Sequence, residues 1–216
     1  GRDMLVAYIA GYETWAELVR RDVPMYHQKG FHPTGIFGAV GAAAACAKLR
    51  KLDANRTAIA IALGASQACG IMSNFGTMTK PFHAGKAAHS GIMAARLAEA
   101  GMTANTDALE HPQGFLSAVS PENNPDLAGD GKLGEDWAII RHGLSIKKYP
   151  ACYGTHRAID AMLDLVDAHP VKPEDVRKVS VHFSSLTSSV LRNRQPDTGL
   201  AAKFSMEFAM ASGLIA

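Results

Sequence analysis

Apolar residues recur every three or four positions along most of residues 1–120, which is the spacing of one face of an α-helix. In residues 4–20 the apolar side chains at this spacing are Leu5, Ile9, Tyr12, Ala16 and Val19. The same reasoning predicts helices over residues 36–52, 55–70 and 84–100, and a shorter helical passage over residues 106–120. The first part of the chain is therefore expected to be all-helical.

The pattern changes after residues 120–134, where proline, asparagine, glycine and aspartate favour an irregular surface segment. Beyond it, residues 137–140 and 144–146 are β-compatible, and residues 179–183 (VSVHF) alternate as a strand should. Helices are expected between these strands, over residues 155–168, and at the end of the chain, over residues 203–216.

This pattern predicts a mostly α protein made of parts of two domains. Residues 1–133 would belong to an all-helical domain, and residues 134–216 to a smaller α+β domain that could return toward the helical domain at its end. The chain does not begin with methionine and stops within an apolar helical pattern, so we expect it to be a piece of a longer protein.

Composition narrows the class of protein. The chain has 216 residues, of which 47% are hydrophobic, as in ordinary globular proteins. A net charge of +2 gives no reason to expect nucleic acid or a membrane surface as partner, and no stretch resembles a membrane span or a signal peptide. Cys46, Cys69 and Cys152 lack paired or metal-type spacing, which favours a reduced, cytoplasmic setting.

Residues 79–91 (TKPFHAGKAAHSG) place basic side chains at the start of a predicted helix. Pro81 suits a first helical turn, and Lys80, His83 and Lys86 lie at or near it. Cations at the positive end of a helix are mildly unfavourable unless an anion joins them, so this stretch could bind a carboxylate or a phosphate. A solvated basic helix start explains the pattern equally well.

His32 and Lys147 lie in two further stretches that precede helices. His32 comes directly before Pro33, where a structural histidine is the more common interpretation. The sequence contains no phosphate loop, dinucleotide fingerprint, zinc-protease motif or nucleophile elbow. If the basic stretches converge, they would hold a multiply charged carboxylic acid, and lysine and histidine could exchange a proton beside it.

Four short motifs in order resemble the MmgE/PrpD family over essentially the whole chain. They are residues 31–35 (FHPTG), 80–85 (KPFHAG), 149–152 (YPAC) with Thr155 and His156, and 202–205 (AKFS). This family includes 2-methylcitrate dehydratase, cis-aconitate decarboxylase and iminodisuccinate epimerase. The resemblance implies an all-helical domain with a smaller lid domain, no metal or organic cofactor, and a homodimer.

The resemblance also implies site residues. His32, Lys80 and Lys147 match active-site positions of the family and are predicted to be catalytic. We assign substrate binding to His83, Lys86 and His156. The decarboxylase of this family has a histidine where this chain has Cys152, and this difference weakens the interpretation of the chain as a decarboxylase. A buried thiol without a catalytic role is the simpler explanation of Cys152.

The predicted function is that of a cofactor-independent lyase acting on a small di- or tricarboxylate. Lys80 and Lys147 would bind substrate carboxylates, while His32 or one of these lysines takes a proton from the adjacent carbon. Dehydration of a 2-methylcitrate-like hydroxy acid is the first choice. Epimerisation or decarboxylation of a related acid, such as iminodisuccinate or cis-aconitate, is the alternative. A catalytically silent fragment with a binding or assembly role is the second alternative.

Overall fold

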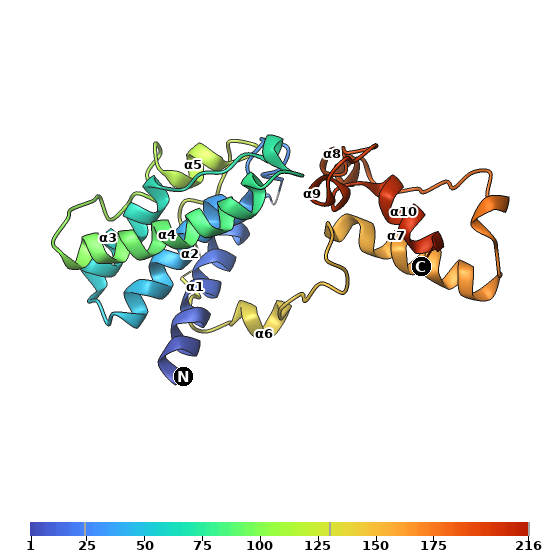
Figure 1. Cartoon of the computed structure of the whole chain (residues 1–216). Coiled ribbons are helices and arrows are strands. Elements are labelled where there is room, and N and C mark those ends of the chain that lie inside the picture. Colours follow the sequence, from blue (N-terminus) through green and yellow to red (C-terminus); the bar gives the residue numbers. More distant parts are fainter. Residues whose placement is uncertain (24, 130, 216) are drawn as a thin grey trace. The chain divides into compact units, whose positions relative to one another are not determined.

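The computed structural model describes residues 1–23, 25–129 and 131–215, and this part of the chain is mostly α-helical, as predicted (Figure 1). It divides into two compact units. Unit 1 comprises Gly1–Ser73 and Lys80–Leu144, and unit 2 comprises Asn74–Thr79 and Ser145–Ala216.

Unit 1 is built around one almost fully buried helix, α2. Its helices are α1 (Arg2–Arg20), α2 (Pro33–Leu49), α3 (Ala54–Ser66), α4 (Thr79–Glu99, whose first residue is in unit 2), α5 (Phe115–Val119) and α6 (Ala138–His142). Helices α1 and α3 both pack against α2, and Phe37 and Val40 of α2 are completely buried. The helices predicted over residues 4–20, 36–52, 55–70 and 84–100 are thereby confirmed, with shifted ends.

Small residues allow the helices of unit 1 to approach closely. A Cβ atom built on Gly91 of α4 would lie 2.6 Å from the backbone nitrogen of Ala43 in α2. A Cβ atom on Gly11 of α1 would lie 2.7 Å from the carbonyl oxygen of Gly41, also in α2. Because the obstructing atoms belong to backbone, these positions cannot take a larger side chain without moving a helix.

Gly91→Ala is therefore expected to lower the free energy of unfolding by about 1–3 kcal/mol through overpacking. Gly85 offers a matched control, since it is exposed on the same helix and a Cβ there would meet nothing within 4 Å. Gly85→Ala should instead raise stability by up to about 1 kcal/mol through helix propensity. Urea unfolding of both variants measures the difference, and equal effects would contradict the close α2–α4 contact.

The strands predicted over residues 137–140, 144–146 and 179–183 are absent, and residues 138–142 form helix α6 instead. The buried carboxylate of Glu13 in α1 accepts hydrogen bonds from the backbone N–H groups of Ala138 and Ile139, at 2.9 Å each. Two free N–H groups at a helix start are thus satisfied by a side chain from another helix, which favours a helix at this position.

The alternating stretch over residues 179–183 neither pairs as a strand nor buries one face, since Val179 is exposed as well. Val181 packs against the core of unit 2, while His182 and Phe183 are exposed. A strand also needs a neighbouring edge, and the only ladder contact in the described residues is an isolated antiparallel bridge between Phe31 and Ile71 in unit 1. The described part of the chain therefore gives no support for a β component in the second domain.

Unit 2 has a smaller core between two helices. Its helices are α7 (Tyr153–Ala168), α8 (Ser185–Val190), α9 (Gly199–Ala202) and α10 (Met206–Ile215). Helix α10 packs on α7, with Met162, Met206 and Met210 buried between them. This confirms the helix predicted over residues 155–168, whereas the helix predicted over 203–216 begins three residues later and is preceded by α9.

Residues 74–79 join unit 2 although they precede α4 in the sequence. The rings of Phe75 and Phe204 lie with centroids 5.4 Å apart, and both side chains are buried. Among the described residues, no helix combines the length and the apolar character needed to cross a membrane.

Candidate functional site

His32 is placed by backbone contacts at the start of α2. It is the N-cap residue of that helix, with Pro33 at the first helical position, yet its side chain makes no capping hydrogen bond. Its backbone N–H donates to the carbonyl oxygen of Gly70 at 3.0 Å, next to the Phe31–Ile71 bridge. The imidazole of His32 is therefore held in position but not used to stabilise its own helix.

The imidazoles of His32 and His83 form a buried pair. Their Nδ1 atoms lie 3.0 Å apart, their ring centroids are 5.2 Å apart, and each side chain is about 5% exposed. Two unprotonated Nδ1 atoms would repel each other at this distance, so a hydrogen bond requires one of them to carry a proton. The pair therefore holds its rings in complementary tautomers.

Gly70 closes one side of the pair. A Cβ atom on Gly70 would lie 3.1 Å from Cγ of His83, and its backbone φ of +129° is one that side chains rarely adopt. The same residue accepts the backbone N–H of His32. Glycine is thus required at this position both by the backbone conformation and by the close approach of the His83 ring.

Burial and Lys80 keep the histidines of this site neutral. Burial lowers the pKa of His32 to about 4, with further lowering by the charges of Lys80, His83 and His27. The pKa values of His83 and His27 are also lowered, in each case first by burial and then by Lys80. Near pH 7 the site therefore combines neutral imidazoles with a half-buried ammonium group.

These shifts predict loss of stability in mild acid. Because the folded state lowers the histidine pKa values, the unfolded chain binds more protons below its own histidine pKa of 6.5. The contribution of His32 is present in full above pH 6.5 and is lost as the pH falls through about 4. The urea midpoint should fall between pH 7 and pH 5, and a His32→Asn variant should show a smaller fall. Equal falls would contradict the shift.

Lys80, His83 and Lys86 all lie in the first turns of α4. The helix begins at Thr79, five residues earlier than predicted, so Lys80 and His83 are neighbours one turn apart. Lys86 follows three residues later and is half-buried. Three predicted residues, His32, Lys80 and His83, interact in unit 1 together with His27, and we call these four residues the basic cluster.

Lys147 and His156 belong to unit 2. Lys147 is exposed, and its Nζ donates to the carbonyl oxygen of Ala151 at 2.8 Å. His156 is buried in α7 with its ring 5.3 Å from that of Tyr149 and 4.8 Å from that of Tyr153, centroid to centroid. Its Nε2 has no hydrogen-bond partner among the described residues.

Tyr149 and Lys148 both bind one carboxylate beside His156. The Tyr149 hydroxyl donates to Oδ1 of Asp160 at 2.6 Å, and Nζ of Lys148 lies 2.7 Å from the same oxygen. The ammonium group of Lys148 is the main cause that lowers the pKa of Asp160, with the Tyr149 hydroxyl adding to it. Cys152, the residue noted for its difference from the decarboxylase, is half-buried at the N-cap of α7.

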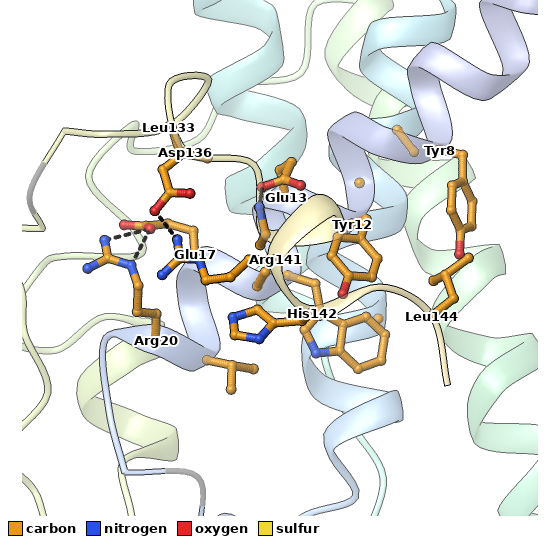
Figure 2. Close-up of a pocket in the computed structure, with 18 of the residues that line it drawn as sticks. Tyr8, Tyr12, Glu13, Glu17, Arg20, Leu133, Asp136, Arg141, His142 and Leu144 are labelled. Carbon is orange, nitrogen blue, oxygen red and sulfur yellow. Dashed lines mark hydrogen bonds and ion pairs between the residues drawn. The ribbon is translucent and has the colours of Figure 1, made fainter. Parts of the chain in front are cut away.

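A cavity of about 880 Å³ lies in unit 1 beside α1, α2 and α6 (Figure 2). Its polar side holds Arg20 paired with Glu17 at 2.7 Å and Arg141 paired with Asp136, and Tyr8 and Tyr12 lie on the other side. The members of the basic cluster do not line it. Both lining arginines bind carboxylate side chains, which makes them less available to an anionic substrate.

Sequence reasoning missed His27 and Gly70 as parts of this site. His27 lies in an irregular stretch with no motif, and its proximity to Lys80 depends on folding. Gly70 carries a weak signal, because a glycine at the end of a predicted helix often adopts a positive φ. Within the described residues, no group of three histidine, cysteine, aspartate or glutamate side chains could hold a metal ion.

Comparison with known proteins adds an independent observation. A model of the MmgE/PrpD N-terminal domain matches residues 1–128, and a model of the MmgE/PrpD C-terminal domain matches residues 149–216. Three relatives, each named cis-aconitate decarboxylase, come from Mus musculus, Homo sapiens and Aspergillus terreus.

The mouse protein is 29% identical over 228 positions, covering 100% of this chain and 45% of its own length. The human protein is 34% identical over 169 positions, covering 74% of this chain and 33% of its own length. The Aspergillus terreus protein is 27% identical over 237 positions, covering 100% of this chain and 47% of its own length. This chain thus spans less than half the length of each of these relatives.

Proposed function

The chain belongs to the MmgE/PrpD family, and from that premise we propose that it forms part of a lyase acting on a small di- or tricarboxylic acid. The observation that carries the proposal is the pairing of buried, neutral His32 with His83 beside the ammonium group of Lys80. A neutral imidazole can accept a proton, and an adjacent cation can bind a carboxylate.

In this proposal His32 is the base and Lys80 binds a substrate carboxylate. His32 takes a proton from the carbon next to the carboxylate, and the charge that develops on that carboxylate is stabilised by Lys80. Lys147 would bind another carboxylate of the acid, with Lys86 and His156 as further binding residues. These roles rest on the family motifs and on the charges of the residues.

We favour dehydration of a 2-methylcitrate-like hydroxy acid as the reaction. The proton moves from carbon to His32, and the carbon–oxygen bond breaks as a carbon–carbon double bond forms. The protonated His32 then gives its proton to the leaving hydroxyl group, which departs as water. A histidine whose pKa is lowered to about 4 is unprotonated at pH 7 and can therefore accept this proton, and its protonated form gives the proton up readily. Epimerisation of a related acid would begin with the same proton abstraction.

Decarboxylation of a cis-aconitate-like acid is the second candidate, because the relatives carry that name. The carbanion left after loss of carbon dioxide needs a proton donor, whereas this chain has Cys152 at the position of the decarboxylase histidine. A catalytically silent role in binding or assembly is the third candidate.

Several expectations from the sequence remain part of the proposal. They are the division into a helical domain over residues 1–133 and a smaller lid domain over residues 134–216, independence from metal and organic cofactors, a homodimer, and a cytoplasmic location. The three cysteines are free in the structure, which is compatible with a reduced setting.

The test is an assay of the full-length gene product with 2-methylcitrate, citrate, cis-aconitate and iminodisuccinate. Proton NMR of the mixtures would identify each product, and intact mass would first establish that the whole protein is present. Loss of water from a hydroxy acid would support dehydration, and release of carbon dioxide from cis-aconitate would identify a decarboxylase instead. No turnover of any acid would favour the silent role.

A further inference from the structure

We propose that His83 is a positioning residue that fixes the tautomer and orientation of His32, and not a ligand of the substrate. This inference rests on the proposed function, in which His32 is the base. It changes the role assigned to His83 from its motif alone and gives the His32–His83 pair a specific task.

Two sides of the His83 ring are already occupied by other groups of the chain. The side chain is buried, its Nδ1 faces Nδ1 of His32 at 3.0 Å, and Gly70 lies against its ring. A substrate carboxylate that bound Nδ1 of His83 would have to break the contact with His32. The Nδ1 atom of His83 is thus already committed to another side chain.

The shared hydrogen bond decides which nitrogen of His32 can act. When Nδ1–H of His32 donates to Nδ1 of His83, the Nε2 atom of His32 carries a lone pair and can accept a proton. In the opposite arrangement His83 donates, Nε2 of His32 already carries hydrogen, and His32 cannot act as a base. The first arrangement is therefore the competent one, with His83 orienting the base as the third member of a catalytic triad does.

The charges around the pair allow only one extra proton at a time. Lys80 and His83 face His32 from α4, and His27 faces it from the segment before α2. A positive charge on any of these groups disfavours a second one nearby. The proton taken from the substrate is therefore the one extra proton that the pair holds.

The kinetic test compares His83→Leu with His83→Asn in the full-length protein. Leucine removes the hydrogen bond, whereas the amide of asparagine can place an acceptor near the position of Nδ1. We expect His83→Leu to lower kcat by about 10- to 100-fold with little change in KM, and His83→Asn to recover most of that loss. The acidic limb of the kcat/KM profile should move in His83→Leu and stay near its original place in His83→Asn.

Two kinetic outcomes would overturn the proposal. A rise in KM without loss of kcat in both variants would identify His83 as a substrate ligand. Equal losses of kcat in both variants would mean that the hydrogen bond to His32 does not matter.

Ring-nitrogen NMR of histidine-labelled protein provides a test that does not need turnover. The Nδ1 atom of His32 should carry hydrogen, and that signal should disappear in His83→Leu; hydrogen on Nδ1 of His83 instead would contradict the proposal. If Nε2 is the protonated atom in both rings, the positioning role is wrong even in an active enzyme. If the Nδ1 hydrogen is present but no acid is turned over, the proposed function fails while the ring pairing stands.

Discussion

Lys80→Met is expected to reduce turnover of the acid substrate by about 100- to 1,000-fold, which is the usual cost of removing one group that stabilises developing negative charge. Methionine keeps much of the length and apolar character of the lysine stem, so folding should be little affected. Lys48→Met is the matched control. Lys48 is exposed near the end of α2, about 24 Å along the helix from His32, and its loss should leave turnover unchanged.

Lys80→Met should also change the pH dependence of kcat/KM. Lys80 lowers the pKa values of His27, His32 and His83, so its removal raises all three. Because the base must be neutral, the acidic limb of the kcat/KM profile should move to higher pH in Lys80→Met. Unchanged turnover together with an unchanged acidic limb would mean that Lys80 lies outside the working site.

His32→Asn is expected to separate activity from stability. Loss of the base should lower kcat by about 100- to 10,000-fold. Asparagine is also among the best N-cap residues, whereas the side chain of His32 makes no capping hydrogen bond. A capping gain of about 1 kcal/mol should offset the lost packing of the imidazole, so the free energy of unfolding should stay within about 1 kcal/mol of the wild-type value.

Steady-state kinetics and urea unfolding measure the two effects in one preparation. His89→Asn provides the control. His89 is exposed on α4, so this substitution makes the same chemical change away from the His32–His83 pair. A parallel fall in activity and stability for His32→Asn would indicate a structural histidine. Full activity would remove His32 from the mechanism.

The helices of unit 1 could be predicted because their signal is local. The apolar spacing over residues 4–20 predicts α1, although the apolar residues that α1 buries are Ala7, Gly11 and Leu18 and not those that define the spacing. The run of alanines around Ala43 reports burial on several sides. The strand predicted over residues 137–140 is wrong because α6 depends on Glu13, which lies 125 residues earlier than Ala138. Propensity within a short window carries no information about such a partner.

In the candidate site, too, local features could be predicted and contacts between distant residues could not. His32, Lys80 and His83 could be singled out one by one from short motifs, but their interaction could not. His32 and His83 are 51 residues apart in sequence, and the bridge between Phe31 and Ile71 helps to fix their approach. The inclusion of His27 and the need for glycine at position 70 likewise follow only from the folded backbone.

The two hydrogen bonds from Ala138 and Ile139 to Glu13, which we call the clasp between α1 and α6, affect the order in which unit 1 folds. A helix of five residues is too short to persist alone, so α6 can form only after α1 has taken its place and offers the carboxylate of Glu13. The Tyr12 hydroxyl, which donates to the carbonyl oxygen of Gly143, secures the other end of the same turn. Helix α6 should therefore fold late and open first, and amide exchange at Ala138 and Ile139 would report when the clasp releases.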